Sequence, residues 1–335
     1  MDPDGVADAE RVPHGSSDDP DVVDLSANIN PRTPEGTRTV YEAALGNARS
    51  YPNDDYPDFR AAAADYVGCD AGRVVPTAGG LAAMRLAVGV TVAPGDSVLV
   101  PYPSFGEYAR EVKLAGGDPA LVPHDDLLAA DPAPHAAAVV CTPNNPTGDC
   151  PEAADLRAFA DRCADADTLL VVDEAFLGFT DRDSLAGHPG TVVARSLTKL
   201  FGLPGLRAGF AVAAGDALDR LRTARPTWSL GAPAVAVGAH VMRDGAFVAE
   251  TRRRVARERE YLRAGLTARG FDVAPSEAPF LLCDVGSDPA DLLAACRERG
   301  IVLRDATTFR GLDRHVRVAV RDRESTDALF DALDA

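Results

Sequence analysis

From about residue 56 onward, short apolar runs alternate with longer amphipathic stretches, and this alternation limits the folds that are open to the chain. Runs typical of buried strands lie at 97–100, 137–141, 168–172, 191–196 and 208–212. Stretches with helical periodicity lie at 59–67, 79–90, 108–115 and 152–165. Short strands that alternate with helices predict a mainly parallel sheet with helices on both faces. The predicted class is α/β.

The sequence pattern changes after Gly215. A long charged helix is expected at 247–269, followed by a hairpin-like β segment and a final helix. We interpret this part as a smaller α+β domain. The predicted division is an N-terminal segment, 1–45, that joins the small domain, a large domain at 46–214 and the small C-terminal domain at 215–335.

Charge and hydropathy narrow the possible partners. The net charge of −17 disfavours binding to nucleic acid or to anionic lipid. No apolar run reaches the ~18 residues of a membrane span, and residues 1–21 show no signal-peptide pattern, so we expect a cytoplasmic protein. The excess of Asp over Glu and the scarcity of lysine resemble proteins of salt-accumulating halophiles; an acidic enzyme from a GC-rich genome is the alternative.

The six cysteines form no Cys-x-x-Cys pair and have no histidine at ligand spacing. Reduced thiols are the simplest interpretation, and we predict no metal.

Lysine is almost absent from this chain. Lys113 and Lys199 are the only lysines among 34 basic residues. Arginine can replace lysine as a charge but not as an amine, because a guanidinium does not deprotonate in proteins. Lys113 has no chemically suggestive neighbours and is expected on the surface. Lys199 follows a predicted strand within Ser-Leu-Thr-Lys, a suitable place for a Schiff-base lysine.

Several further motifs follow predicted strands, and in sheets of this kind ligands bind beyond the carboxyl ends of the strands. Each motif alone has a common structural explanation as a turn, a helix cap or core packing. The motifs are, in chain order, Thr77-Ala78-Gly79-Gly80-Leu81, Pro103-Ser104-Phe105, Thr142 to Gly148, Asp173-Glu174-Ala175-Phe176, Ser196 to Lys199 with Arg207, and a late set of Arg304, Arg317 and Arg321.

In this order the motifs resemble those of the class I/II aminotransferase superfamily, the fold type I enzymes that use pyridoxal phosphate (PLP). The resemblance covers nearly the whole chain. Its specific matches are Asn145-Pro146-Thr147-Gly148, Asp-Glu-Ala-Phe from Asp173, and Ser-Leu-Thr-Lys with Arg207 eight residues beyond Lys199. It implies a large domain with a mainly parallel central sheet and a smaller α+β domain.

The resemblance also implies roles for single residues. Lys199 would bind the cofactor covalently and carry the proton, and Asp173 would pair with the pyridine nitrogen. Asn145 would bind the cofactor's O3′, and Phe105 would stack on its ring. The cofactor phosphate would be held by Gly80, Leu81, Ser196 and Arg207, with Tyr51 reaching the phosphate of a neighbouring subunit. A homodimer with composite sites follows from the last role.

The N-terminal motifs are more similar to the threonine-phosphate decarboxylases of cobalamin biosynthesis than to the histidinol-phosphate aminotransferases. They are Val12 to Ser16, Asp24 to Pro31 and Tyr51 to Tyr56. Phe176 also favours the decarboxylase, because the aminotransferases usually carry a tyrosine at this position. In the decarboxylase interpretation, Arg304 and Arg317 hold a substrate phosphate, with His14 and Asn30 nearby. The aminotransferase is the alternative, and a PLP-binding regulatory module is a remote one that the acidic composition disfavours.

Overall fold

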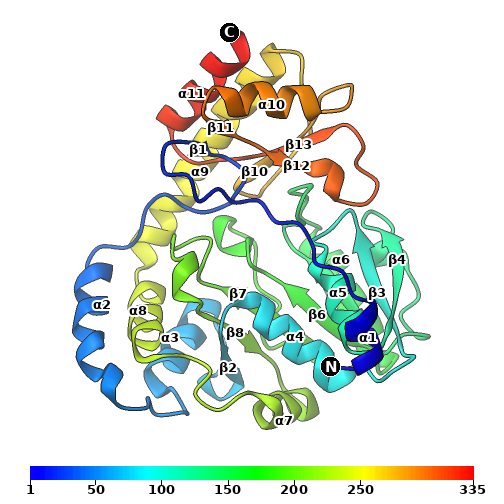
Figure 1. Ribbon diagram of the computed structural model, residues 1–335. Coiled ribbons are helices and arrows are strands. Elements are labelled where there is room, and N and C mark those ends of the chain that lie inside the picture. Colours follow the sequence, from blue (N-terminus) through cyan, green and yellow to red (C-terminus); the bar gives the residue numbers. More distant parts are fainter.

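The computed structural model describes residues 1–335, apart from the side chain of Asp8, and shows two bodies of unequal size (Figure 1). Among the described residues, the larger body contains one sheet with the strand order β2-β8-β7-β6-β5-β3-β4. Its strands are β2 (Val74–Thr77), β3 (Ser97–Tyr102), β4 (Asp118–Pro123), β5 (Ala137–Cys141), β6 (Leu169–Asp173), β7 (Thr191–Ser196) and β8 (Gly209–Val212).

Strands β3 to β7 run parallel to one another, and β8 runs antiparallel to both β7 and β2. The sheet is therefore mainly parallel, as the sequence pattern predicts. The central strands β5, β6 and β7 are valine- and alanine-rich and buried along most of their length, because helices cover both faces.

The helices of the larger body form two layers around this sheet. On one face lies a core that includes Met84, Val112 and Leu221. On the other lies a core that includes Phe59 and Phe159. The helices of the first layer are α4 (Gly80–Thr91), α5 (Glu107–Leu114) and α7 (Gly215–Ala224), and those of the second are α3 (Pro57–Val67), α6 (Ala153–Asp165) and α8 (Ala232–Met242).

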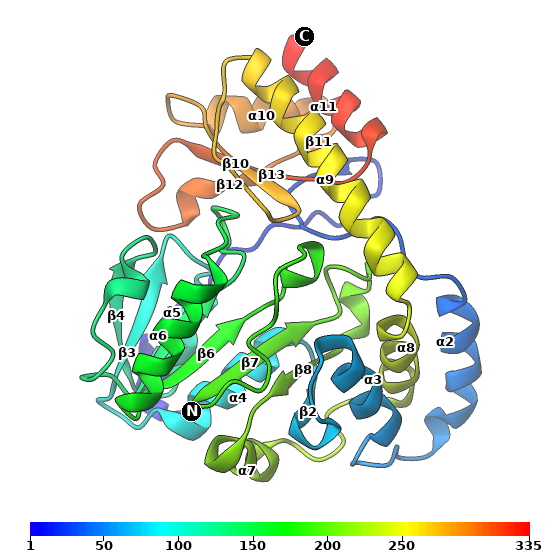
Figure 2. The ribbon, with the colours of Figure 1, turned by 180° about the vertical axis from the view of Figure 1, so that it is seen from behind.

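The smaller body carries a sheet with the order β12-β13-β10-β9. Its strands are β9 (Asp272–Val273), β10 (Phe280–Asp284), β12 (Arg304–Asp305) and β13 (His315–Ala319), and its helices are α10 (Ala290–Glu298) and α11 (Arg323–Asp334). The long helix α9 (Gly245–Ala268) links the two bodies, as both views show (Figures 1 and 2).

The N-terminal part of the chain contacts both bodies. Helix α1 (Pro3–Asp8) packs on α5, and β1 (Val23–Asp24) pairs in parallel with β11 (Ile301–Val302) of the smaller body. Helix α2 (Thr37–Leu45) packs against α8. Helices α7 and α8 come after residue 214, where the large domain is predicted to end. Helix α7 packs against α4, and α8 packs against α2 and α3, all of which precede that boundary. The three-part division of the chain stays a proposal.

No helix of the described residues is long and apolar enough to cross a membrane.

Candidate active site

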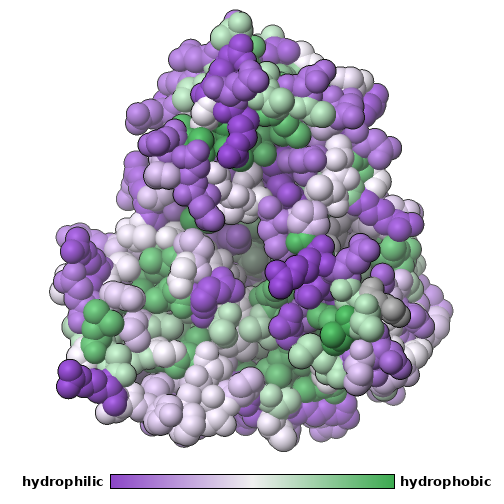
Figure 3. All heavy atoms as spheres, viewed as in Figure 1, coloured by the Kyte–Doolittle hydropathy of each residue, from purple (hydrophilic) through white to green (hydrophobic). Residues whose placement is uncertain are grey.

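A hollow lies where the two bodies meet, and it is visible on the face shown in Figure 3. The cavity measured there has a volume of about 330 Å³. Its walls come from the N-terminal segment, the carboxyl ends of β5 and β6, the loop after β7, and β12 and β13. The predicted site residues that line it are His14, Phe105, Asn145, Asp173, Lys199, Arg304 and Arg317.

Lys199 lies in the loop after β7, with its side chain largely withdrawn from water. Burial and the positive charges of Arg317 and Arg207 together lower the pKa of its amine to about 8, although the nearby carboxylate of Asp173 opposes this shift. A neutral amine is the nucleophilic form of lysine. The surroundings of Lys199 therefore favour the amine chemistry that the sequence predicts.

Asp173 is the last residue of β6, and its carboxylate is fixed from two sides. The Tyr108 hydroxyl donates to Oδ2 at 2.6 Å, and the Ala175 backbone N–H donates to Oδ1 at 2.9 Å. Burial raises the pKa of Asp173, and these two hydrogen bonds oppose that rise. A carboxylate held in this way can pair with a protonated ring nitrogen. Tyr108, in α5, is a site residue that sequence reasoning missed.

The N-terminus of α4 carries groups of the kind that bind a phosphate, here called the phosphate cradle. Gly79 precedes this helix with φ of +98°, and a Cβ there would lie 2.9 Å from Nη2 of Arg207. A Cβ added to Gly80 would lie 3.2 Å from the Cβ of Ser196. The Ser196 hydroxyl lies 2.7 Å from the hydroxyl of Thr198. Backbone N–H groups at a helix N-terminus, hydroxyls and a guanidinium together match a phosphate group.

Phe105 and Asn145 both line the cavity. The Phe105 ring contacts the Tyr108 ring edge-on, with centroids 5.5 Å apart. The Asn145 side-chain oxygen accepts a hydrogen bond from Arg317. Amine, carboxylate, aromatic ring, amide and phosphate cradle are the groups that PLP requires, so the residues present fit this cofactor.

The part of the cavity wall that β12 and β13 contribute is cationic. Arg304 and Arg317 face each other in register on β12 and β13, and both are buried. Burial, with Arg304 adding to it, lowers the pKa of Arg317 to about 9. Arg317 Nη2 donates to the Ser26 carbonyl at 2.8 Å. Two buried guanidiniums side by side, with no carboxylate that pairs with them among the described residues, suit an anionic ligand.

Asn30 was predicted to contact the substrate, but the structure places it outside the cavity. Its side chain donates to the Leu200 carbonyl at 2.7 Å and accepts from Arg254 at 2.6 Å. Asn28 lines the cavity instead, and its Oδ1 is buried without a hydrogen-bond partner in the described part of the chain. The Ile29 backbone N–H donates to the Ala27 carbonyl at 2.9 Å, so a tight turn lies between the two asparagines.

Tyr51 also lies away from the cavity of its own chain. Its side chain is 77% exposed and stacks on Trp228 with ring centroids 4.2 Å apart. This position is consistent with a role outside its own subunit.

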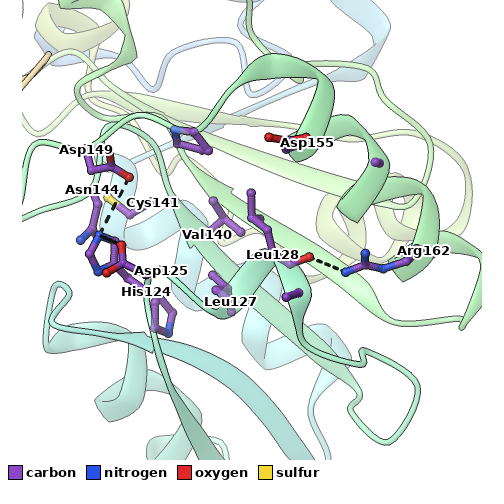
Figure 4. Close-up of a pocket in the computed structure, with 14 residues that line it drawn as sticks. His124, Asp125, Leu127, Leu128, Val140, Cys141, Asn144, Asp149, Asp155 and Arg162 are labelled. Carbon is purple, nitrogen blue, oxygen red and sulfur yellow. Dashed lines mark hydrogen bonds and ion pairs between the residues drawn. The ribbon is translucent and has the colours of Figure 1, made fainter.

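A second cavity, of about 420 Å³, lies beside β5 and α6 (Figure 4). Leu127, Leu128 and Val140 form its apolar wall, and Asp125 and Asp155 lie at its rim. None of the predicted site residues lines it in the described part of the structure, so the cavity around Lys199 is the candidate active site.

Comparison with known proteins decides the family. The model of the family described as aminotransferase class I and II matches residues 20–333. The chain belongs to this family. It is therefore a PLP-dependent enzyme with the fold type I architecture, as the sequence motifs predict.

Individual relatives agree with this placement. The histidinol-phosphate aminotransferase of Symbiobacterium thermophilum is 34% identical, over 94% of this chain and 90% of its own length. The structure of histidinol-phosphate aminotransferase from Sinorhizobium meliloti with pyridoxal-5′-phosphate has a TM-score of 0.84 at 23% identity, covering 92% and 88% of the two chains. L-threonine-O-3-phosphate decarboxylase from Porphyromonas gingivalis has a TM-score of 0.83 at 23% identity, covering 92% and 98%. The two structures show a shared fold.

Proposed function

We propose that the protein is a PLP-dependent aminotransferase that acts on a phosphorylated amine such as histidinol phosphate. The observation that carries the proposal is the pair of buried arginines, Arg304 and Arg317, in the same cavity as Lys199. A dianionic phosphate suits such a pair, because guanidinium groups bind phosphate oxygens in a bidentate manner. The relative of Symbiobacterium thermophilum, which bears the name histidinol-phosphate aminotransferase, supports this choice of reaction.

PLP, when bound, supplies a carbonyl carbon for amines and a ring that accepts electrons. Gly80, Leu81, Ser196 and Arg207 are proposed to hold its phosphate, together with the partner subunit's Tyr51. Asn145 would bind its phenolic oxygen, Phe105 would cover one ring face, and Asp173 would hold a proton at the ring nitrogen.

Lys199 is then the group that moves protons at the reacting carbon. Its amine, with a pKa of about 8, would take the proton from the substrate Cα and hold it for the later return step. Arg304, Arg317 and His14, with Asn28 in place of Asn30, would orient the substrate by its phosphate. That anchor would determine which bond of Cα is placed to break.

Decarboxylation of L-threonine phosphate is the second candidate. It is the reaction that the sequence motifs favour. Phe176 favours it, because it leaves the cofactor's phenolic oxygen without the hydroxyl that aminotransferases usually supply. The Phe176 ring packs edge-on against Phe280 at 5.1 Å. The relatives support the aminotransferase better. The relative cited above at 34% identity is a histidinol-phosphate aminotransferase, whereas the decarboxylase cited above is a structural neighbour at 23% identity.

A paired assay tests the two reactions. We expect the PLP-loaded enzyme to consume more than one equivalent of histidinol phosphate per site only when 2-oxoglutarate is present. Release of CO₂ from L-threonine phosphate without any 2-oxo acid would establish the second candidate instead. Failure of both assays, with the cofactor bound, would overturn the proposed substrate class.

Two further proposals concern the protein's surroundings. The exposed position of Tyr51 supports a homodimer in which each subunit completes the other's cofactor site. The cysteines, which are free thiols in the structure, support a cytoplasmic location.

A further inference from the structure

Residues 9–16, here called the N-terminal strap, run from α1 toward the smaller body (Figure 1), and residues 12–16 line the cavity. Arg110 of α5 donates to the Glu10 carbonyl at 3.0 Å, and Arg304 of β12 donates to the Pro13 carbonyl at 2.8 Å. Val12 packs closely on Gly106: a Cβ added to Gly106 would lie 2.8 Å from Cγ1 of Val12. The strap thus depends on both α5 and the anion-binding strand β12.

The strap carries one side chain that is tied to a buried carboxylate. Nε2 of His14 lies 2.9 Å from Oε1 of Glu107, the first residue of α5. Glu107 is 5% exposed, and its other oxygen accepts from Arg110 at 3.1 Å. The His14 ring also contacts the Phe105 ring, with centroids 5.6 Å apart. Glu107 and Phe105 therefore fix the ring from two directions.

We propose that Glu107 is a positioning residue that holds His14 over the anion-binding end of the cavity and thereby increases affinity for phosphate-bearing substrates. His14 lines the same cavity as Arg304 and Arg317. When its ring is protonated, both nitrogens donate. Nε2 then donates to Glu107, and Nδ1 is left for an oxygen of the ligand. The inference rests on the proposed anionic substrate but not on which reaction follows.

The carboxylate of Glu107 matters for its charge as well as for its shape. A hydrogen bond between two charged partners is roughly twice as strong as a neutral one. In Glu107→Gln the amide keeps the size of the side chain but loses the charge. The ring and the strap should then be held less firmly over the cavity.

Glu111 provides a matched control on the same helix. It is 3% exposed and binds Arg85 through two hydrogen bonds of 2.8 and 2.6 Å. It also lies 3.6 Å from Nη1 of Arg110, but no hydrogen bond or ion pair joins it directly to the strap in the described structure. Glu111→Gln therefore removes a buried carboxylate of α5 but leaves the connection between Glu107 and His14 in place.

Binding of inorganic phosphate to the PLP-loaded enzyme, measured by calorimetry, tests the inference. The cofactor fills its own phosphate cradle, so the titration reports on the substrate end. We expect Glu107→Gln to raise the phosphate Kd about tenfold and Glu111→Gln to leave it unchanged. With the substrate that is turned over, KM should rise in Glu107→Gln while kcat stays near that of the parent enzyme.

A double-mutant cycle shows whether Glu107 acts through His14. In a His14→Asn background, Glu107→Gln should have no further effect on the phosphate Kd. An unchanged Kd in Glu107→Gln, or an equal loss with and without His14, would overturn the inference. If Glu107→Gln does not fold, Glu107→Asp replaces it: the shorter side chain withdraws the carboxylate from the ring, and phosphate binding should again weaken. Because phosphate binding needs no turnover, these results are distinguishable from a failure of the paired assay.

Discussion

At the scale of single residues, Lys199 and Asp173 both line the candidate active site, and neighbouring groups shift the pKa of each. Burial and two guanidiniums lower the pKa of Lys199 to about 8. The pKa of Asp173 is raised by burial and lowered by the Tyr108 hydroxyl. One group is thus prepared to react as an amine, and the other is held in place to balance a positive charge.

The pKa of Lys199 predicts how cofactor loading depends on pH. An ordinary lysine has a pKa near 10.5, so only a small fraction is neutral at pH 8, whereas about half of Lys199 is neutral there. The rate at which the apoenzyme binds PLP covalently should rise about tenfold per pH unit below pH 8 and level off above it. Stopped-flow absorbance of the visible cofactor band measures this rate. A rate that levels off only near pH 10 would contradict the lowered pKa.

Lys199 was predictable because the chain keeps almost no lysine, and its neighbours along the sequence supported the choice. Lys113, expected on the surface, is exposed. Tyr108 and Glu107 were not recognised because they lie in the first turn of an amphipathic helix, where a polar residue usually faces water. Asn30 was predicted and Asn28 was not recognised, because the directions of two asparagines in an irregular segment depend on tertiary hydrogen bonds.

At the scale of elements, the site is assembled from the carboxyl ends of β5, β6 and β7 and the N-terminus of α4. The apolar runs predicted β5 and β7 with the bounds that the structure shows. Strands β2 and β4 were missed, and both contain proline, Pro76 in β2 and Pro119 and Pro123 in β4. They are the edge strands of the sheet, where the missing N–H of a proline is tolerated.

The geometry at the start of α4 predicts that Gly79→Ala weakens cofactor binding. The residue has φ of +98°, and the added Cβ would lie 2.9 Å from Arg207. Strain of about 1–3 kcal/mol is expected for such a backbone position, so the Kd for PLP should rise about tenfold or more. Gly89→Ala, further along α4, is the control, because its Cβ would meet no atom of the described residues within 4 Å. Fluorescence titration of the apoenzyme with PLP measures both, and equal affinities would contradict the assigned cradle.

At the scale of the whole molecule, the sequence motifs predicted the fold type and the cofactor but ranked the two reactions differently from the relatives. The motifs favoured the decarboxylase, and the relatives favour the aminotransferase. The two reactions differ in the orientation of the substrate relative to the cofactor ring, and many residues of two bodies determine that orientation together. Short motifs cannot encode it, because the same fold supports both reactions.

The proposed homodimer predicts a change in tryptophan fluorescence. Trp228 is the only tryptophan in the sequence. It is 47% exposed and stacks on Tyr51, so a partner subunit that receives Tyr51 should also cover the indole. Emission should shift to shorter wavelength on association, in parallel with the mass change seen by analytical ultracentrifugation. Emission that stays constant through that transition would place the interface elsewhere.

The central claim is that Lys199 is the residue that binds the cofactor. Reduction of the PLP-loaded enzyme with borohydride makes this bond permanent, and peptide mass spectrometry then locates it. With two lysines in the chain, the result is a choice between two peptides. We predict the phosphopyridoxyl group on the peptide that contains Lys199, and none on any peptide after Lys199→Ala. Label on Lys113, or no label on either lysine, would contradict the account.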